Sequence, residues 1–277
     1  MFNIIVNSIN KKLETDFELN LHGAALKVLE DDDNPIRFNS FAFSFRELTR
    51  HIFKRLAPDE KVLKCQWYKN EIDKANGITR VQRMLYAIKG GLSDEFIQEE
   101  LELDINVITK NLKKAIDSLN KYTHIEEATF NTHSQPGNDM VYKSLDSLNE
   151  FLETIENVRN EIILAYELRI SDLIDEAVSS DVIQEIDIIA THYWVDGTYV
   201  DNISVVSIDD SIISVLVSGS IDVEHQYGSD GDFSRGVGAR IESSYPIKVT
   251  IPIDVKYPLD FSIDANDVKV DNSKFFE

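Results

Sequence analysis

Residues 211–227 read "SIISVLVSGSIDVEHQY", and this stretch decides the fold. Its β-branched residues alternate with polar ones, which is typical of a strand with one face on a core and the other in water. Similar runs occur before it in "GTYVDNISVVSI" and after it in "ARIESSYPIKVTIPIDV". Because "DD" and the glycine-rich "GSDGDFSRGVG" separate these runs, the sequence predicts an antiparallel meander from about residue 190 onward.

The sequence before this point has the periodicity of helices. Apolar residues recur at helical spacing in "FSFRELTRHIFKRL" (43–56), "NVITKNLKKAIDSLNKY" (106–122) and a long run over 144–178. Turn formers in "DDDNP", "LAPDE", "KGGLSD" and "NTHSQPGND" separate the helical segments. We therefore predict an α+β protein, with an all-helical N-terminal domain over 1–178 and a small antiparallel β-sheet domain over 179–277.

Composition excludes several classes of protein. The 277 residues include one cysteine, Cys65, which excludes an internal disulfide and a cysteine-rich zinc site and fits a reducing compartment. The opening "MFNIIVNSINKK" lacks the basic region of a signal peptide, and no window approaches the roughly 18 apolar residues of a membrane span, so we expect a cytoplasmic protein without membrane contact. The motifs of P-loop NTPases, serine hydrolases and zinc proteases are missing from the sequence.

Charge is distributed unevenly along this acidic chain, whose formal net charge is −21. Residues 179–277 contain 6 Lys/Arg and 18 Asp/Glu, a net charge of −12, whereas residues 37–89 contain 12 and 5, a net charge of +7. A basic island of this kind attracts a polyanion that the rest of the surface repels. Two interpretations follow: the island binds a nucleic acid, or it docks on acidic parts of its own protein.

The helix predicted at the centre of this island carries an ordered set of polar residues. Arg46, Arg50 and Lys54 recur every four residues on its exposed side, and Glu47 and His51, also four apart, lie between that row and the apolar stripe. A glutamate one turn before a histidine can fix its tautomer, an arginine can hold phosphate, and a histidine can move the proton of a ribose hydroxyl. The residues therefore suit a metal-free ribonuclease, or else a boundary histidine beside a solvated arginine row.

Other basic and aromatic residues flank this helix. Tyr68 and Lys69, in "CQWYKNE", could stack a base and hold a phosphate, and Arg80 and Arg83 extend the basic track. His124 follows a predicted helix, where the helix end favours its charged form, and is an accessory candidate. The alternative for each is structural, with the aromatic side chains in the core and the cations in solvent.

A helix-turn-helix is a further interpretation of residues 93–125. A short acidic helix leads through "LDIN" to a helix bearing Lys110, Lys113 and Lys114, which could enter a DNA groove. The glycine usual in such a turn is missing.

Four carboxylates near the glycine-rich turn are weak candidates for a metal site. Asp222 and Glu224 alternate on one predicted strand, and Asp230 and Asp232 follow in the turn, so oxygen ligands for Mg²⁺ or Ca²⁺ are available. Their spacing matches no metal-binding loop pattern, and acidic hairpin tips are usually solvated. We predict no metal and no cofactor.

Several phrases together resemble a known family, among them "ALKVLEDDDNPIRFNSFAFSFRELTRHIFKRLAPDE", "GITRVQRMLYAIKGGLSDEFI" and "IATHYWVDGTYVDNISVVSID". They are similar to proteins described as predicted pPIWI-associating nucleases, which occur in bacterial conflict and defence gene neighbourhoods. The resemblance implies a nuclease that acts with another protein of a defence system.

A second resemblance concerns residues 46–51 alone. Arg46 and His51 are similar to the R-x4-H pattern of HEPN ribonuclease-like domains, and Glu47 supplies the polar residue that follows the arginine. The resemblance implies an all-helical unit that dimerises and cuts RNA without a metal, with Arg46 on the phosphate and His51 as acid/base. HEPN domains usually carry this pattern on a late helix, whereas here the helix comes early.

These observations favour a metal-independent, HEPN-type endoribonuclease of antiviral defence. Its expected partners are RNA or DNA, another defence protein and, as the HEPN resemblance implies, a second copy of the chain. One alternative is a non-enzymatic subunit whose acidic β domain docks a basic partner. A weaker alternative is a helix-turn-helix DNA-binding regulator.

Overall fold

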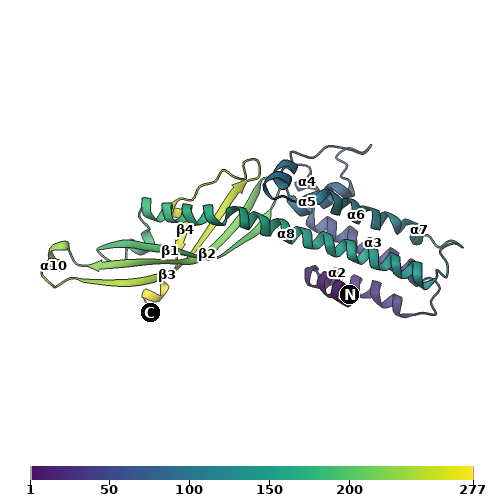
Figure 1. The fold of residues 1–277 in the computed structure, drawn as a ribbon, viewed down its shortest axis with the longest axis horizontal. Coiled ribbons are helices and arrows are strands. Elements are labelled where there is room, and N and C mark those ends of the chain that lie inside the picture. The colour runs from purple at the N-terminus through teal and green to yellow at the C-terminus, as the bar shows by residue number, and fades with distance from the viewer. Residues whose placement is uncertain (1, 277) are drawn as a thin grey trace. The chain divides into compact units, whose positions relative to one another are not determined.

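The computed structural model describes residues 2–276, apart from the side chain of Phe233 (Figure 1). The chain forms two compact units, which meet in sequence between Val158 and Arg159. This division falls inside the long helix α8 (Ser134–Ser180), whereas the change of sequence texture predicted it at residue 178. The second half of α8 belongs to the β unit, in which its Tyr166 is buried and packs against the ring of Phe261.

The first unit is helical, which confirms the prediction for the N-terminal part. Its elements are α1 (Phe2–Lys12), α2 (Asp16–Lys27), the 3-10 turn η1 (Val28–Glu30), α3 (Arg37–Leu56), α4 (Asp59–Val62), α5 (Arg80–Lys89), the π-helical turn η2 (Phe96–Glu100), α6 (Ile105–Ser118), α7 (Asn120–Thr123) and the first half of α8. Local sequence sets where helices begin: the Thr79 hydroxyl accepts from the Gln82 amide and forms a capping box with Gln82 at the start of α5.

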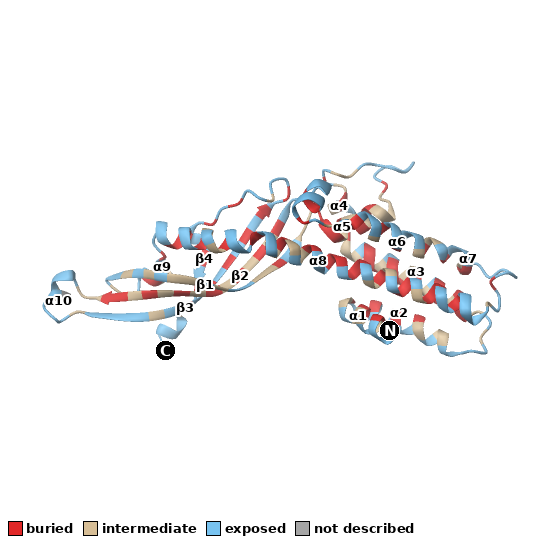
Figure 2. Cartoon of the chain, viewed as in Figure 1, coloured by how far each residue is buried: buried red, intermediate tan, exposed pale blue. Residues whose placement is uncertain are grey.

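Helix α3 supplies much of the core of this unit. Phe41, Phe45, Leu48 and Ile52, the predicted apolar stripe, have no exposed surface, and Leu56 at the end of the stripe is half-buried. Helices α2, α5 and α7 pack against α3. The basic row lies outside this core, because Arg46 is half-buried and Arg50 and Lys54 are exposed. Figure 2 shows how buried and exposed residues are distributed over the helices of this unit. Burying this stripe fixes the direction in which the arginines point.

The second unit is a four-stranded antiparallel sheet, as the alternating runs predicted. Its elements are the second half of α8, α9 (Gln184–Asp187), β1 (His192–Ile208), β2 (Ile212–Tyr227), α10 (Asp230–Ser234), β3 (Ala239–Asp254), the 3-10 turn η3 (Ala265–Asp267), β4 (Val268–Val270) and the 3-10 turn η4 (Ser273–Phe275). The strands follow one another in space in the order β1-β2-β3-β4. The α+β class is therefore confirmed.

The two faces of the sheet differ in character. Alternate residues of β2, and of β3 over residues 245–253, are buried, as Val217 and Val249 are. The residues between them are half-buried on β2 and exposed on β3 (Figure 2). Tyr166 of α8 is buried and donates to the carbonyl of Pro258 at 2.6 Å, which ties the helix to this unit. In the part of the chain that the structure describes, no helix is both long and apolar enough to cross a membrane.

Candidate functional site

The basic side of α3 forms one wall of a cavity of about 410 Å³ within the first unit. Its basic lining residues are Arg46, Arg50 and Lys54 from α3 and Arg80 and Arg83 from α5. Glu47, Thr49 and Phe53 of α3 and Asp59 of α4 complete the lining. Five cations and two carboxylates give the lining a formal net charge of +3. The fold thus gathers five predicted nucleic-acid or phosphate contacts, together with Glu47, around one space.

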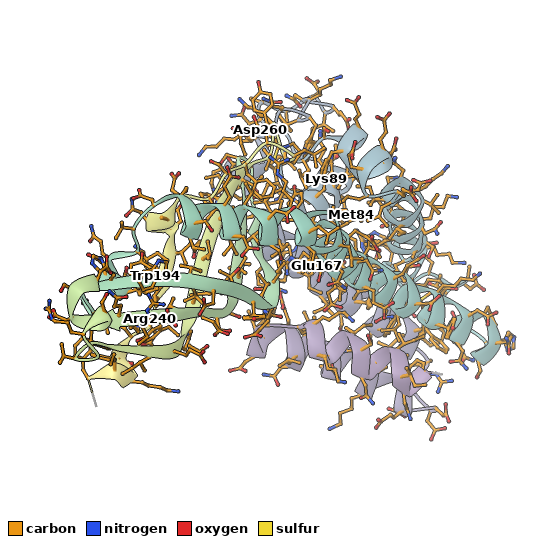
Figure 3. The ribbon with its side chains drawn as sticks, turned by 60° about the vertical axis from the view of Figure 1, so that its left-hand side comes forward. Met84, Lys89, Glu167, Trp194, Arg240 and Asp260 are labelled. Atoms are coloured by element: carbon orange, nitrogen blue, oxygen red, sulfur yellow. The ribbon has the colours of Figure 1, made fainter. Side chains whose placement is uncertain are left out.

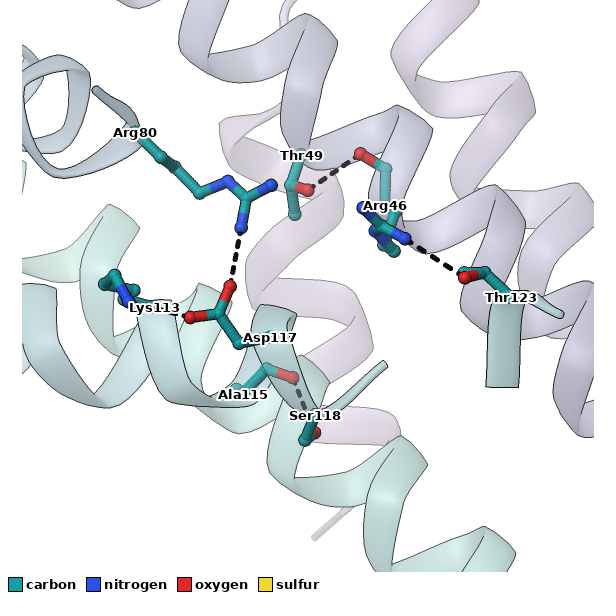
Figure 4. Close-up of polar contacts among 8 residues, drawn as sticks. All are labelled: Arg46, Thr49, Arg80, Lys113, Ala115, Asp117, Ser118 and Thr123. Carbon is teal, nitrogen blue, oxygen red and sulfur yellow. Dashed lines mark hydrogen bonds and ion pairs between the residues drawn. The ribbon is translucent and has the colours of Figure 1, made fainter. Parts of the chain in front are cut away.

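Two of the arginines are held by α6 and α7, as Figure 4 shows. Arg80 donates to Asp117 Oδ1 at 3.1 Å, and Lys113 donates to the other carboxylate oxygen of Asp117 at 2.8 Å. Arg46 donates to Thr123 Oγ1 at 3.1 Å. These partners fix the guanidinium groups while leaving some of their five N–H donors for another acceptor.

Arg83 is held at the other side of the cavity. Its Nη1 donates to the carbonyl of Ala57 at 2.8 Å and lies 2.8 Å from Asp59 Oδ1. The hydrogen bond from Arg83 lowers the pKa of Asp59 below its ordinary value, and the charges of Arg83 and Lys54 act in the same direction. Asp59 therefore stays ionised and offsets part of the positive charge.

Glu47, Arg50 and His51 form a chain of contacts in which arginine is the middle member. Arg50 donates from Nε and Nη2 to Glu47 Oε2, at 2.9 and 2.7 Å, and its Nη2 lies 3.0 Å from His51 Nε2. The spacing of Glu47 and His51 predicted a direct hydrogen bond between them. Among residues 2–276 no such bond is present, and Glu47 instead accepts two hydrogen bonds from the charged Arg50 guanidinium group at Oε2.

His51 is not one of the residues that line the cavity. Its ring packs against Phe17 of α2, with the centroids 4.7 Å apart and the planes tilted by 60°. The side chain is half-buried, so it is neither a core residue nor freely solvated. Arg50 connects it to the cavity.

The arrangement suits an anion with several oxygen atoms. Guanidinium groups can bind phosphate through two parallel hydrogen bonds, which a lysine cannot do. The Arg50 side chain is 57% exposed and Lys54 is exposed, so both are accessible from solvent. The lining therefore presents solvent-accessible cations to an anion that enters the cavity.

Three other predicted residues lie outside the cavity. The Tyr68 hydroxyl donates to the carbonyl of Gly77 at 3.0 Å, and Tyr68 packs on a small cluster that includes Cys65. Lys69 is exposed, and its carbonyl accepts from the Gln82 side chain at 2.6 Å. His124 is exposed, and its carbonyl accepts from Thr129 at 3.1 Å. None of these three residues lines the cavity.

The lysines of the helix-turn-helix interpretation all lie on α6. Lys110 and Lys114 are exposed, and Lys113 is paired with Asp117. The acidic segment before α6 ends in the π-helical turn η2. DNA reading by this segment stays a prediction.

The four carboxylates of the β unit do not form a metal site in the described residues. Asp222 and Glu224 share the polar face of β2, as predicted, opposite Ser244 and Glu242 of β3. Elsewhere, Asp230 accepts from Gln226 at 2.9 Å, and Asp232 accepts from Ser229 and Arg235. No group of three or more His, Cys, Asp or Glu side chains among the described residues could hold a metal ion. Hydrogen bonds with neighbouring residues therefore fix the side chains of Asp230 and Asp232.

Comparison with known proteins gives one result for both units. Two family models, each described as "Predicted pPIWI-associating nuclease", match residues 10–148 and 155–276. The first match contains every residue that lines the cavity, and the second contains the sheet. No curated protein and no solved structure matches the chain. The two matches together span nearly all of it, so the chain belongs to the predicted pPIWI-associating nuclease family.

Proposed function

We propose that this chain is a nuclease of a bacterial antiviral defence system, which binds the backbone of RNA at the α3–α5 cavity and cleaves it with His51 as acid/base. The observation that carries the proposal is the cavity itself, where five cations from two helices surround a space of about 410 Å³. In a chain with a formal net charge of −21, such a site attracts phosphate while the remaining surface repels it. Membership of a predicted nuclease family supports the same function.

Arg46 and Arg80 bind the phosphate from two directions in this mechanism. Each has one identified side-chain partner, Thr123 and Asp117 respectively, and keeps further donors for phosphate oxygens. Their fixed positions let them stabilise the negative charge that develops on the phosphate oxygens during the reaction. Arg50 and Lys54 extend the contact to the neighbouring backbone.

His51 supplies the proton transfer. When a phosphate binds the Arg50 guanidinium group, the hydrogen bond from Arg50 to His51 Nε2 breaks. The lone pair of Nε2 can then accept the proton of a ribose 2′-hydroxyl. The 2′-oxygen attacks phosphorus and the bond from phosphorus to the 5′-oxygen breaks. His51 returns the proton that it took from the 2′-hydroxyl to the leaving 5′-oxygen. The products are a cyclic phosphate end and a 5′-hydroxyl end. DNA lacks the attacking hydroxyl, so this route is specific for RNA.

A cleavage assay tests the proposal directly. Wild type, His51→Ala and the surface control His133→Ala are first compared by circular dichroism, and His133 is suitable because it is exposed. Each is then incubated with labelled single-stranded RNA, tRNA and DNA, in EDTA and in Mg²⁺. We expect wild type and His133→Ala to cleave RNA in EDTA, and His51→Ala to lose about 100-fold or more in rate.

Other outcomes separate the alternatives. Cleavage that requires Mg²⁺ and is equally fast in His51→Ala would indicate that metal-binding carboxylates, and not His51, carry out the reaction. RNA binding that depends on Arg50, without cleavage under any condition, would favour the non-enzymatic subunit. Sequence-selective binding of duplex DNA that Lys110→Ala and Lys114→Ala weaken would favour the helix-turn-helix regulator.

A further inference from the structure

A second cavity, of about 590 Å³, lies within the β unit. One side is formed by the last residues of α8 and the segment that follows it, including Asp181 and Asp187. The other side is formed by the first four residues of β1, His192 to Val195. All of these residues belong to the second unit, so the cavity is a property of that unit alone.

The electrostatic character of this cavity is negative. Burial raises the pKa of Tyr193, whose hydroxyl accepts from the Ile183 amide at 2.7 Å, and the charges of Asp187 and Asp181 raise it further. The end of α8 adds the partial negative charge of its last carbonyl groups. Residues 159–276 carry 22 Asp/Glu and 8 Lys/Arg, a net charge of −14. The cavity therefore favours a cationic group.

One wall of the cavity is an unpaired strand edge. Within residues 2–276, β1 is the first strand of the sheet and pairs on one side only, with β2. His192 to Val195 pair in regular register with Gln226 to Val223, and the first irregularity follows at once, between Val195 and Gly197. Two more irregularities interrupt the rest of β1. Because bulges discourage pairing along an edge, the regular stretch beside the cavity is the part best suited to accept another strand.

An aromatic side chain is fixed at this stretch. The guanidinium group of Arg240 lies 4.8 Å from the centre of the Trp194 ring and 3.2 Å from Glu224, and Figure 3 shows Trp194 and Arg240 close together. The Trp194 residue is still 44% exposed. A tryptophan held in place and accessible to solvent is a typical anchor of a protein interface.

We infer that the edge of β1 at His192–Val195 binds an extended, basic segment of a partner protein. The segment adds to the sheet as a short strand and places a lysine or arginine side chain in the cavity lined by Asp181 and Asp187. A second copy of the chain is a poorer occupant, because it would bring the same carboxylates to this edge. This inference is independent of the proposed nuclease site, which lies in the other unit.

Peptide binding to the full-length chain tests this inference. The probe is a fluorescent eight-residue peptide of alternating arginine and valine, and its anisotropy is followed at physiological ionic strength. We expect saturable binding that weakens about tenfold or more in the double variant Asp181→Asn, Asp187→Asn, since charge-assisted hydrogen bonds are lost. The control Glu167→Gln, Asp172→Asn removes the same charge from two exposed positions of α8 and should bind as wild type does.

A second peptide separates strand pairing from charge attraction. Methylation of its alternate backbone amides keeps every arginine but removes the N–H groups that a strand edge requires, so we expect its binding to be lost. Equal binding of both peptides, equal affinity of the two double variants, or no binding to wild type would overturn the inference. A concentration-dependent dimer in sedimentation that Asp181→Asn, Asp187→Asn strengthens would instead assign the edge to a second copy.

Discussion

Arg50 Nη2 lies 3.0 Å from His51 Nε2, and the same guanidinium group donates two hydrogen bonds to Glu47. Arginine has only donors, so Nε2 of His51 must be the acceptor and carries no proton in this arrangement. Arg50 also lines the basic cavity, which His51 does not. An anion that binds Arg50 therefore competes directly with Glu47 and His51.

Replacing Arg50 with alanine should lower both the affinity for RNA and the dependence of that affinity on salt. Because the side chain is 57% exposed and contacts phosphate in the proposed complex, Arg50→Ala should reduce affinity about tenfold and lower the log–log salt slope by about 1. Fluorescence anisotropy with a short RNA at several salt concentrations measures both quantities. Lys143→Ala, at an exposed position of α8, removes the same charge as a control. A similar loss in both variants would show that only the overall charge matters.

Replacing Asp117 should have the opposite effect. Asp117 holds Arg80 at 3.1 Å and Lys113 at 2.8 Å, so it competes with phosphate for Arg80. Asp117→Asn removes this charge and should strengthen RNA binding about three- to tenfold, which corresponds to roughly 1 kcal/mol for a partly exposed pair. The same anisotropy assay applies, with Asp146→Asn, exposed on α8, as the matched control. Weaker binding of Asp117→Asn would mean that the carboxylate positions Arg80 instead of competing for it.

Helical periodicity was sufficient to predict the two sides of α3. The spacing of its apolar residues identified the stripe that is buried, and hence the row of cations that is not. The meander was predictable for the same reason, because one face of β2 and one face of β3 meet the core. The boundary at Val158 was not, since one continuous helix serves both units and its sequence pattern does not change there.

The partners of the cavity residues could not be predicted from spacing along the chain. Asp117 is 37 residues from Arg80, and Thr123 is 77 residues from Arg46, so only the packing of α6 and α7 brings them together. For Glu47 and His51, by contrast, the spacing predicted a hydrogen bond that the described part of the structure does not contain. A spacing of four residues allowed a contact, but the neighbouring Arg50 competes for the same carboxylate.

The buried His22 should make the first unit less stable in mild acid. His22 has no exposed surface, its Nδ1 lies 2.8 Å from Asn10 Oδ1, and burial lowers its pKa to about 4. Above the unfolded pKa of about 6.5 the ring is neutral in both states, and its contribution to stability is fully present. Below that pH the unfolded chain binds a proton that the folded chain excludes, so the free energy of unfolding should fall by about 2 kcal/mol at pH 5.

Urea unfolding at pH 7 and pH 5 measures this loss. The protein has two tryptophans, so a Trp194→Phe background leaves Trp67 to report on the first unit alone. In that background, His22→Gln should abolish the roughly 2 kcal/mol decrease in the free energy of unfolding between pH 7 and pH 5. His133→Gln, at an exposed position, should retain this decrease. An unchanged pH dependence in His22→Gln would show that other groups cause the acid sensitivity.

Gly219 should be required for the pairing of β1 with β2. It lies opposite Val200, just before an irregularity in β1, and a Cβ atom at Gly219 would collide with the carbonyl oxygen of Tyr199. A backbone atom in the middle of a paired strand cannot move aside without disturbing the ladder. Gly219→Ala should therefore lower the free energy of unfolding of the second unit by about 1 to 3 kcal/mol.

A second glycine of the same sheet provides the comparison for this prediction. Gly197 also lies at an irregularity of β1, but the nearest atom to its added Cβ is the Tyr199 hydroxyl at 3.8 Å, an ordinary contact. Gly197→Ala should thus stay within about 0.5 kcal/mol of wild type. A Trp67→Phe background leaves Trp194 of β1 to report urea unfolding of the sheet. Equal effects of the two substitutions would mean that strand propensity, and not the close approach of Tyr199 to Gly219, decides how the sheet tolerates alanine.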